Sequence, residues 1–312
     1  MTNGKRIWRI IKKSLPVKRK YNVCFMPYKA EMWDSLKSIY DACMEDKRVK
    51  VTVKWLAYSL KERGRLTYRR VEQVKGIPDE VIMDATVAYP KFDVIFIHNI
   101  YDDENGVTEV IAKTSQIRHF TDRLVYVPYF VMDETPDNFI KKKGMYSVTD
   151  VVVDNAEEKA RYKKAFYSMG ISPDLIVCQS PKYDFVKEPV EIPEAWLPKL
   201  RRENILVNAH LSRAYSNKNS ISDIKMRLET YANDPLVCII FRPHPLMVET
   251  IKSLGKPEKL AEWNELREWI LSIDNFIYDA TSDYRYAFQA SDWMLTDASS
   301  LTLLYDKRQE KL

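Results

Sequence analysis

Apolar runs that stop abruptly at polar residues recur along the chain, and they predict most of its strands. Residues 236–246 read Leu-Val-Cys-Ile-Ile-Phe-Arg-Pro-His-Pro-Leu, and residues 290–301 read Ala-Ser-Asp-Trp-Met-Leu-Thr-Asp-Ala-Ser-Ser-Leu. Each has the pattern of a buried parallel strand, whose carboxyl end opens onto a ligand crevice in open α/β sheets. The pattern predicts strands at 21–26, 49–56, 92–98, 124–130, 151–153, 175–178, 205–209, 237–241, 276–278 and 293–296.

Segments with helical spacing lie between these runs, at 31–44, 156–169, 222–232, 259–270 and 284–289. Alternation of this kind is typical of parallel sheets covered by helices. Residues 186–199 carry Pro189, Pro193 and Pro198 among acidic residues, which indicates a linker. The expected fold is therefore α/β, with two Rossmann-like domains at 21–187 and 199–312.

The first twenty residues have the pattern of an amphipathic helix. At 100° per residue an apolar face gathers around Trp8 and Ile11, and a basic face includes Lys12 and Lys13. We expect residues 1–20 to form an arm that lies on an anionic membrane surface, with Trp8 at the headgroup boundary. The alternatives are a helix that packs on its own domain and a frayed basic tail.

Charge and composition narrow the function classes. The chain of 312 residues has a net charge of +5, yet residues 1–20 contain eight Lys or Arg and no acid. The remainder has 41 basic and 44 acidic groups, a balance of −3, which does not favour nucleic-acid binding. No apolar run approaches the roughly 20 residues that span a bilayer. We expect a cytoplasmic protein, attached peripherally to the inner face of the membrane.

Several common motifs are missing from the sequence. It has no GxGxxG, no GxxxxGK[ST] and no GxSxG, which disfavours NAD enzymes, P-loop kinases and serine hydrolases. The four cysteines are scattered without a CxxC pair, so we expect free thiols, no metal and no cofactor. Asp102, Asp103 and Glu104 form an acidic run, and such runs are usually solvated.

Two predicted strand ends carry groups suited to an anion. Arg242 and His244 follow the strand at 237–241, and Ser299 and Ser300 stand at the start of a helix after the strand at 293–296. A cation, an imidazole and the free N–H groups of a helix start favour a phosphate. We expect a diphosphate site there. Surface ion pairing of the arginine and simple capping by the serines are the alternatives.

Further polar residues at strand ends are weaker candidates. His210 and Asp297 could line a nucleotide cleft or cap local turns. In the first half of the chain, His98 ends an apolar run and Asn99 follows it. A histidine there could act as a base or could form structural hydrogen bonds across the end of the sheet.

These residues also resemble a known family. The segment 242–246 (Arg-Pro-His-Pro-Leu), followed by Ser291-Asp292 and by 297–301 (Asp-Ala-Ser-Ser-Leu), is similar to the carboxyl-terminal signature of the CDP-glycerol glycerophosphotransferase family of teichoic-acid polymerases and primases. Residues 27–36 (Pro-Tyr-Lys-Ala-Glu-Met-Trp-Asp-Ser-Leu) and 98–102 (His-Asn-Ile-Tyr-Asp) resemble a bacterial branch of it. The similarity covers roughly residues 21–305.

The resemblance implies a GT-B fold, with the acceptor on the first domain and the donor nucleotide on the second. It implies transfer of a glycerol-phosphate or related polyol-phosphate unit from CDP-glycerol or another CDP-alcohol to a lipid-linked or polymer acceptor. Arg242, His244, Ser299 and Ser300 would hold the donor phosphates, and His244 could protonate the leaving CMP. His98 would stand in for the catalytic base.

Two departures from the family keep other functions open. The His-Gly-Thr-Pro-like element of the polymerases has no counterpart here, and the segment that normally follows the Ser-Ser helix is missing. We therefore expect a second domain shortened at its carboxyl end. A GT-B glycosyltransferase that uses a nucleotide sugar and a non-catalytic relative are the alternatives.

Overall fold

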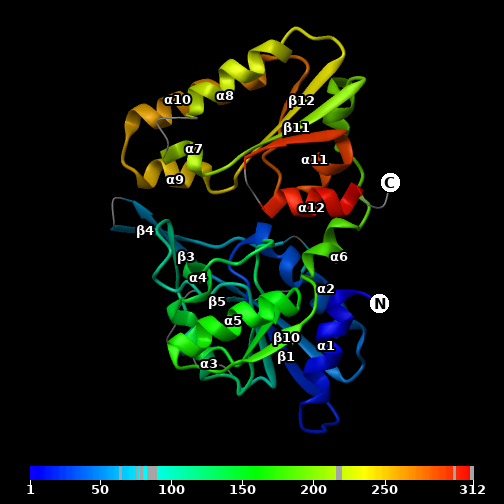
Figure 1. Cartoon of the computed structure of the whole chain (residues 1–312), viewed down its shortest axis with the longest axis vertical. Helices are drawn as coiled ribbons and strands as arrows, with labels where there is room; N and C mark the ends of the chain where they lie inside the picture. Colours follow the sequence, from blue (N-terminus) through cyan, green and yellow to red (C-terminus); the bar gives the residue numbers. More distant parts are fainter. Residues whose placement is uncertain are drawn as a thin grey trace. The chain divides into compact units, whose positions relative to one another are not determined.

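The computed structural model describes residues 1–62, 65–74, 76–77, 80–82, 90–215, 220–297 and 300–309. The chain divides into two compact units. Unit 1 comprises Met1–Lys61 and Leu66–Phe185, and unit 2 comprises Glu62–Arg65 and Val186–Leu312. Both are built from parallel sheets with helices on their faces, as the alternating sequence pattern predicts (Figure 1).

Unit 1 contains a seven-stranded sheet in the order β10-β9-β8-β6-β1-β2-β5. All neighbouring strands of this sheet are paired in parallel. Its strands are β1 Tyr21–Phe25, β2 Val49–Leu56, β5 Glu80–Ile82, β6 Val94–Ile97, β8 Leu124–Tyr126, β9 Asp150–Val153 and β10 Asp174–Val177. Because the strand order reverses between β1 and β6, this is a doubly wound sheet.

Helices cover both faces of this sheet. Alternate strand residues point to opposite faces, so Val23 and Phe96 join one core with α1 and α2, whereas Cys24 and Ile95 join another with α5. The helices and 3₁₀ turns are α1 Asn3–Lys13, η1 Ala30–Met32, α2 Asp34–Glu45, α3 Thr114–Arg118, α4 Asp137–Ile140, η2 Lys143–Ser147, α5 Ala156–Met169 and α6 Lys182–Val186.

The strands of a three-stranded sheet, in the order β4-β3-β7, were not predicted from the sequence. It consists of β3 Tyr58–Glu62, β4 Arg65–Arg70 and β7 Thr108–Val110, and β3 pairs with β7 antiparallel. These strands mix charged with apolar residues, so no continuous apolar run marks them.

Unit 2 contains a parallel sheet in the order β13-β12-β11-β14, formed by β11 Glu203–Ala209, β12 Val237–Pro243, β13 Phe276–Tyr278 and β14 Trp293–Thr296. One face packs on α8 Ile221–Leu228, α9 Met247–Ser253 and α10 Pro257–Ser272. Helix α11 Arg285–Ala290 contacts β11, and α12 Ser300–Gln309 contacts β14. The shorter elements are η3 Glu194–Lys199, α7 Ser212–Tyr215 and η4 Glu229–Tyr231.

Residues 3–13 form the predicted helix, and its apolar face packs on its own domain, the alternative to the predicted membrane contact. Helix α1 lies beside α2 (Figure 1), and Ile7, Trp8 and Ile11 are at most 5% exposed within the core of unit 1. The Trp8 indole N–H donates to Asp46, and Lys12 forms an ion pair with the same carboxylate. The apolar face that was predicted to contact a membrane therefore packs into the core of unit 1.

The start of α1 is also tied to the end of unit 1. The Asn3 side chain and the Gly4 backbone N–H both donate to the Asp184 carboxylate, at 3.1 and 3.0 Å. Gly4 has no side chain, and a Cβ there would lie 2.1 Å from the Ser38 carbonyl carbon. Only glycine allows this close approach of α1 to α2.

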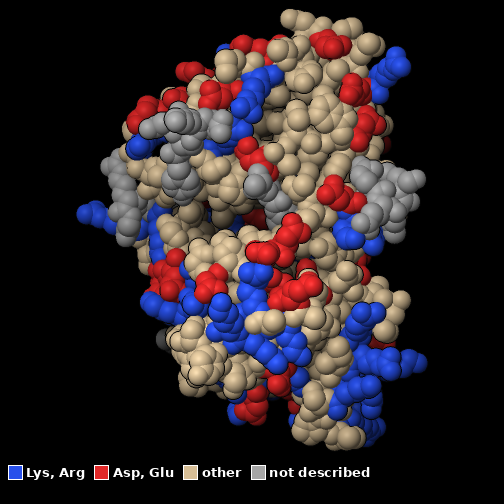
Figure 2. All heavy atoms as spheres, in the orientation of Figure 1, with Lys and Arg blue, Asp and Glu red and all other residues tan. Residues whose placement is uncertain are grey.

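The basic side of α1 remains accessible. Lys5, Arg6, Arg9 and Lys13 are exposed, and Figure 2 shows Lys and Arg atoms gathered at the lower right, over the region where α1 lies in Figure 1. Among the described residues, no helix has the length and apolarity needed to cross a bilayer.

Replacing Trp8 with alanine should destabilise unit 1. Truncation of a buried tryptophan typically costs about 3 kcal/mol or more, and Trp8 also loses its hydrogen bond to Asp46. Urea unfolding of Trp8→Ala should show this loss, whereas Ile10→Ala should stay within about 0.5 kcal/mol, because Ile10 is 39% exposed. A Trp8→Ala protein of unchanged stability would contradict the core role of α1.

Candidate functional site

The strongest candidate site lies at the carboxyl edge of the unit 2 sheet. The strand order reverses at β11, whose partners are β12 on one side and β14 on the other. In doubly wound sheets such a reversal leaves a crevice outside the strand ends, and ligands bind there. The segments that leave β11 and β14 therefore supply the candidate residues.

Asp297 follows β14 and organises the segment after β11. Its Oδ2 accepts hydrogen bonds from the backbone N–H of His210 at 3.0 Å and from Nε of Arg213 at 2.9 Å. Its Oδ1 accepts one from Nη2 of Arg213 at 2.6 Å. Burial opposes ionisation, but these hydrogen bonds outweigh it and lower the pKa of the Asp297 carboxyl. Asp297 is thus a fixed anion that orients Arg213.

Arg213 is the cation of this edge that the sequence analysis did not predict. It is 8% exposed, and its Nη1 is buried without a hydrogen-bond partner in the described part of the chain. It lines a cavity of about 370 Å³ together with Asn208, Thr296, Ile224 and Tyr231. An unpaired buried donor costs about 1–3 kcal/mol, which a ligand oxygen would offset.

His210 and His244 lie together beside this edge. Their ring centroids are 6.0 Å apart with an interplanar angle of 89°. Nδ1 of His210 accepts the Ser212 N–H at 3.2 Å, and Nδ1 of His244 accepts the Leu246 N–H at 3.1 Å. Each neutral ring therefore carries its proton on Nε2.

Burial lowers the pKa of His210, although the Asp297 carboxylate opposes this shift. The neutral ring is thus favoured in the folded protein. The structure places both predicted histidines, His210 and His244, at one sheet edge, with Nε2 as the donor atom of each neutral ring.

Arg242 does not have the position expected of a phosphate ligand. Its side chain is 4% exposed, and its guanidinium donates to Asp279 and Thr281 at the end of β13. The Asp279 side chain is fully buried, so the pair offsets its charges internally. We therefore correct the expected role of Arg242. It is part of a buried ion pair that joins two neighbouring strands, and not a ligand of the donor phosphates.

The two predicted serines cannot be compared with these positions. Ser299 lies outside the described residues, and Ser300 is described only as the first residue of α12. Asn99, the other cleft candidate, belongs to unit 1, where its Oδ1 accepts the Tyr101 N–H at 3.1 Å and closes a local turn. The roles predicted for Ser299 and Ser300 stay predictions.

His98 has a structural position instead of the predicted catalytic one. It is fully buried, Nδ1 donates to the Met32 carbonyl at 3.0 Å, and Nε2 accepts the Tyr28 N–H at 3.1 Å. Burial is the main reason why its pKa falls to about 3. Since the lone pair that a base needs already accepts a backbone N–H, we correct the assignment of His98 as general base.

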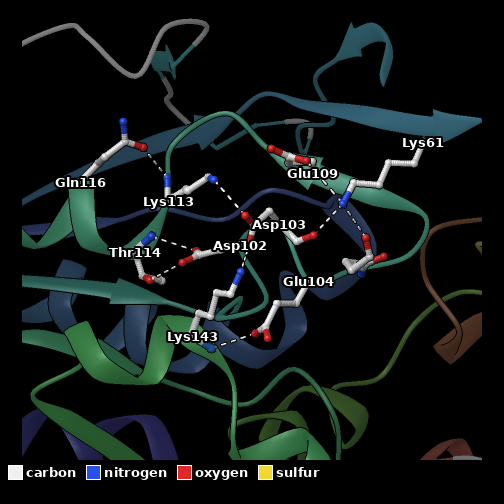
Figure 3. A network of polar contacts seen from close by, with 10 residues as sticks. Lys61, Asp102, Asp103, Glu104, Glu109, Lys113, Thr114, Gln116 and Lys143 are labelled. Atoms are coloured by element: carbon white, nitrogen blue, oxygen red, sulfur yellow. Dashed lines mark hydrogen bonds and ion pairs between the residues drawn. The ribbon is translucent and has the colours of Figure 1, made fainter. Parts of the chain in front are cut away.

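The acidic run at 102–104 is held by lysines and backbone donors (Figure 3). Asp103 pairs with Lys113 at 3.1 Å and with Lys143 at 3.4 Å, and Asp102 accepts the Thr114 N–H and hydroxyl at 2.9 and 2.8 Å. Within the described ranges, no group of three His, Cys, Asp or Glu side chains could hold a metal ion.

Comparisons with known proteins show the fold. No family model and no curated protein sequence matches this chain. S. aureus MnaA, solved with UDP, is 9% identical with a TM-score of 0.53 and covers 90% of this chain and 75% of its own. A putative UDP-N-acetylglucosamine 2-epimerase from Listeria monocytogenes is 10% identical with a TM-score of 0.53, covering 93% and 77%.

The wall teichoic acid polymerase TagF is 13% identical over 97% of this chain and 72% of its own, with a TM-score of 0.49. This score lies below 0.5, so the TagF match supports no conclusion. The matches above 0.5, at 9–10% identity, show similarity of fold. They confirm the predicted α/β class with two Rossmann-like domains of the GT-B type.

The position of His98 predicts an acid-dependent loss of stability. The histidine titrates near pH 6.5 when unfolded and near 3 when folded, so the unfolded state binds one more proton between these values. Its contribution is complete above about pH 6.5 and falls by about 1.4 kcal/mol per pH unit as the pH drops. In urea unfolding at pH 7, 6 and 5, His98→Asn should be less stable at pH 7 and lose less stability on acidification.

The exposed His119 provides the matched control. His119→Asn should keep the pH dependence of the unmodified protein. Equal slopes for the unmodified protein and His98→Asn would show that His98 is not a buried neutral histidine.

Proposed function

We propose that this protein is a transferase that moves a glycerol-phosphate or related polyol-phosphate unit from a CDP-activated donor to a lipid-linked or polymer acceptor. One observation carries the nucleotide-binding part of the proposal. At the strand-order reversal of unit 2, Arg213 has a buried N–H group without a partner in the described ranges, and His210 and His244 lie on the same sheet edge. Donors of this kind suit the oxygens of a diphosphate.

The chemistry of transfer suits these donors. When an acceptor hydroxyl attacks the β-phosphorus, CMP leaves, and negative charge grows on the non-bridging and leaving oxygens. Preorganised N–H groups stabilise that charge. In the proposal, Arg213 binds the donor diphosphate, His210 donates to it, and His244, in its protonated imidazolium form, gives a proton to the leaving CMP. Ser299 and Ser300 add hydroxyl and backbone donors.

The neighbouring cavity suits a nucleoside. Its volume of about 370 Å³ lies within the range of small-ligand sites. Ile224, Leu228 and Tyr231 supply apolar and aromatic surface, and Asn208 and Thr296 supply polar groups. The choice of a CDP-alcohol rests on the sequence resemblance at 242–246 and 297–301, which extends to both halves of the chain.

Two other functions use the same features. A glycosyltransferase that takes a nucleotide sugar would bind its diphosphate at the same residues, and the UDP of the MnaA structure makes uridine nucleotides a necessary comparison. A non-catalytic relative would bind a nucleotide and release nothing from it.

The acceptor side of the proposal includes an anionic membrane surface. A lipid-linked acceptor would bring the protein to the inner face of the membrane. Because the apolar face of α1 is buried, attraction would come from the exposed Lys5, Arg6, Arg9 and Lys13. Binding of this electrostatic kind weakens with salt.

Nucleotide binding should depend on Arg213. CMP and CDP should raise the thermal midpoint of the protein, and the tighter ligand should raise it more. CDP should raise it more than UDP does. Arg213→Lys keeps the charge but loses the two-point contact with Asp297, so the dissociation constant for CDP should rise about tenfold. Arg202→Lys, at the opposite end of β11, should bind as the unmodified protein does. Equal CDP affinity in both variants would remove Arg213 from the site.

Turnover should depend on His244. Incubation with CDP-glycerol, other CDP-alcohols, UDP-sugars and GDP-sugars, together with membrane lipid, should release CMP from a CDP donor. Loss of general-acid catalysis typically costs 10²–10⁴-fold in rate, so His244→Ala should be slowed by about that factor while His119→Ala is not. Release of UDP or GDP alone would favour the glycosyltransferase, and no release from any donor would favour the non-catalytic relative.

A further inference from the structure

A groove runs along the edge of the large sheet of unit 1. Helices α1 and α5 and the segment 171–177, which contains β10, form its walls (Figure 1). Its accessible volume of about 740 Å³ lies within the range of small-ligand sites. The described strand order ends at β10, so this strand forms the edge of the sheet. All of these elements belong to unit 1, and the groove is therefore complete within one compact unit.

The floor of the groove is apolar. Phe166 and Ile176 are buried there, at 2% and 6% exposure. Ile10, Tyr167 and Val177 also line the groove, although they are 39%, 90% and 40% exposed. A single exposed apolar side chain is ordinary, but several around one groove with a polar rim indicate an interaction site. The groove therefore suits a partner with an apolar part.

Cations border the groove on both sides. Lys159 and Lys163 line it from α5, where they lie one turn apart. On α1, Arg6 and Lys13 are exposed one turn before and one turn after the isoleucine that lines the groove. The charge of Arg6 also acts on the Cys178 thiol, directly after β10. Figure 2 shows Lys and Arg atoms over the face of unit 1 on which α5 and α1 lie in Figure 1.

Two acids belong to the same lining. Asp150 is 2% exposed and accepts hydrogen bonds from Nε of Arg123 at 3.0 Å and from its Nη2 at 2.6 Å. The same guanidinium donates to the Ile11 carbonyl at 3.1 Å, which ties the last turn of α1 to the sheet. Asp174, at the start of β10, is exposed. Because Arg123 and Asp150 neutralise each other, the lysines of α5 and the cations of α1 outnumber the remaining acid of the lining.

An apolar floor between two groups of cations matches the chemistry of an anionic phospholipid. An acyl chain gains by leaving water, and a headgroup phosphate is attracted by Lys and Arg. A peptide strand added to β10 is another partner that fits a sheet edge. However, β10 has only four residues, and such short edge strands disfavour strand addition. The charges and the edge together favour the lipid.

We propose that this groove binds an anionic phospholipid, with an acyl chain along its apolar floor and the headgroup phosphate between the cations of α1 and α5. The inference deepens the membrane partner of the proposed function, and it rests on that function for the presence of a membrane lipid at the protein. Helix α1 then has two roles: its apolar face packs into unit 1, and its basic side, together with Ile10, contacts lipid.

The first experiment measures sedimentation with vesicles of phosphatidylcholine, with and without phosphatidylglycerol, in the absence of nucleotide. The protein should bind only the vesicles that contain the anionic lipid. Lys163→Gln should weaken this binding about fivefold. Lys164→Gln removes the same charge from the next position of α5, which is exposed and does not line the groove, and it should have a much smaller effect. Equal effects of the two variants would overturn the inference, as would equal binding to both kinds of vesicle.

A soluble short-chain lipid tests the groove without a membrane. Dihexanoylphosphatidylglycerol, below the concentration at which it forms micelles, should give a binding isotherm in titration calorimetry, whereas inorganic phosphate should give none. Ile10→Ala combined with Tyr167→Ser should weaken this binding about tenfold. Tyr146→Ser, at a position of unit 1 that is 61% exposed and outside the groove, should bind as the unmodified protein does. Equal affinity in both variants, or binding of phosphate as tight as that of the lipid, would contradict the acyl-chain site.

Lipid binding and turnover are separate measurements, so the inference and the proposed function can fail separately. If no nucleotide donor is cleaved but the short-chain lipid binds in the groove, the proposed function fails and the lipid site stands without it. If donors are cleaved and the lipid gives no isotherm, the inference alone is overturned. Dimerisation of the protein in place of lipid binding would also overturn it and would show that β10 pairs with a second copy.

Discussion

The ion pair between Asp297 and Arg213 is the interaction on which the unit 2 site depends. It links the ends of β14 and β11 across 84 residues of sequence, at the place where the strand order reverses. Asp297 accepts two guanidinium hydrogens and the His210 backbone N–H. Nη1 of Arg213 is buried and has no hydrogen-bond partner among the described residues. The buried cation is tolerated because one carboxylate offsets its charge.

The two units present opposite electrostatic surroundings at equivalent edges of their sheets. In unit 2, a guanidinium and two imidazoles lie beside a cavity with apolar walls. In unit 1, the carboxyls of Asp154 and Glu158 line a smaller cavity. Both arise from one structural rule, since parallel strands bring all their carboxyl ends to one edge. The residues that follow the strands therefore set the charge at each edge.

The fold class could be predicted because buried parallel strands are written as continuous apolar runs, as at 237–241 and 293–296. The partners of individual side chains could not be predicted from the sequence. Arg242 ends such a run, but its partner Asp279 lies 37 residues on and is set by the register of β12 and β13. Arg213 lies four residues beyond β11 in a polar segment. Only its nearness to a strand end could have indicated it as a site residue. The pattern of α1 was identified correctly, yet amphipathicity shows only that one face leaves water, and the core of unit 1 takes that face.

The attachment of α1 to Asp184 bears on the order in which the protein folds during synthesis. Asn3 and Gly4 bind the carboxylate of a residue about 180 positions downstream. Helix α1 is therefore synthesised long before Asp184, which lies almost at the end of the same unit. Until then Ile7, Trp8 and Ile11 have no complete core to enter. During synthesis of unit 1, α1 should therefore be exposed as a basic amphipathic helix. A chaperone or the membrane would contact this helix before it packs into the domain.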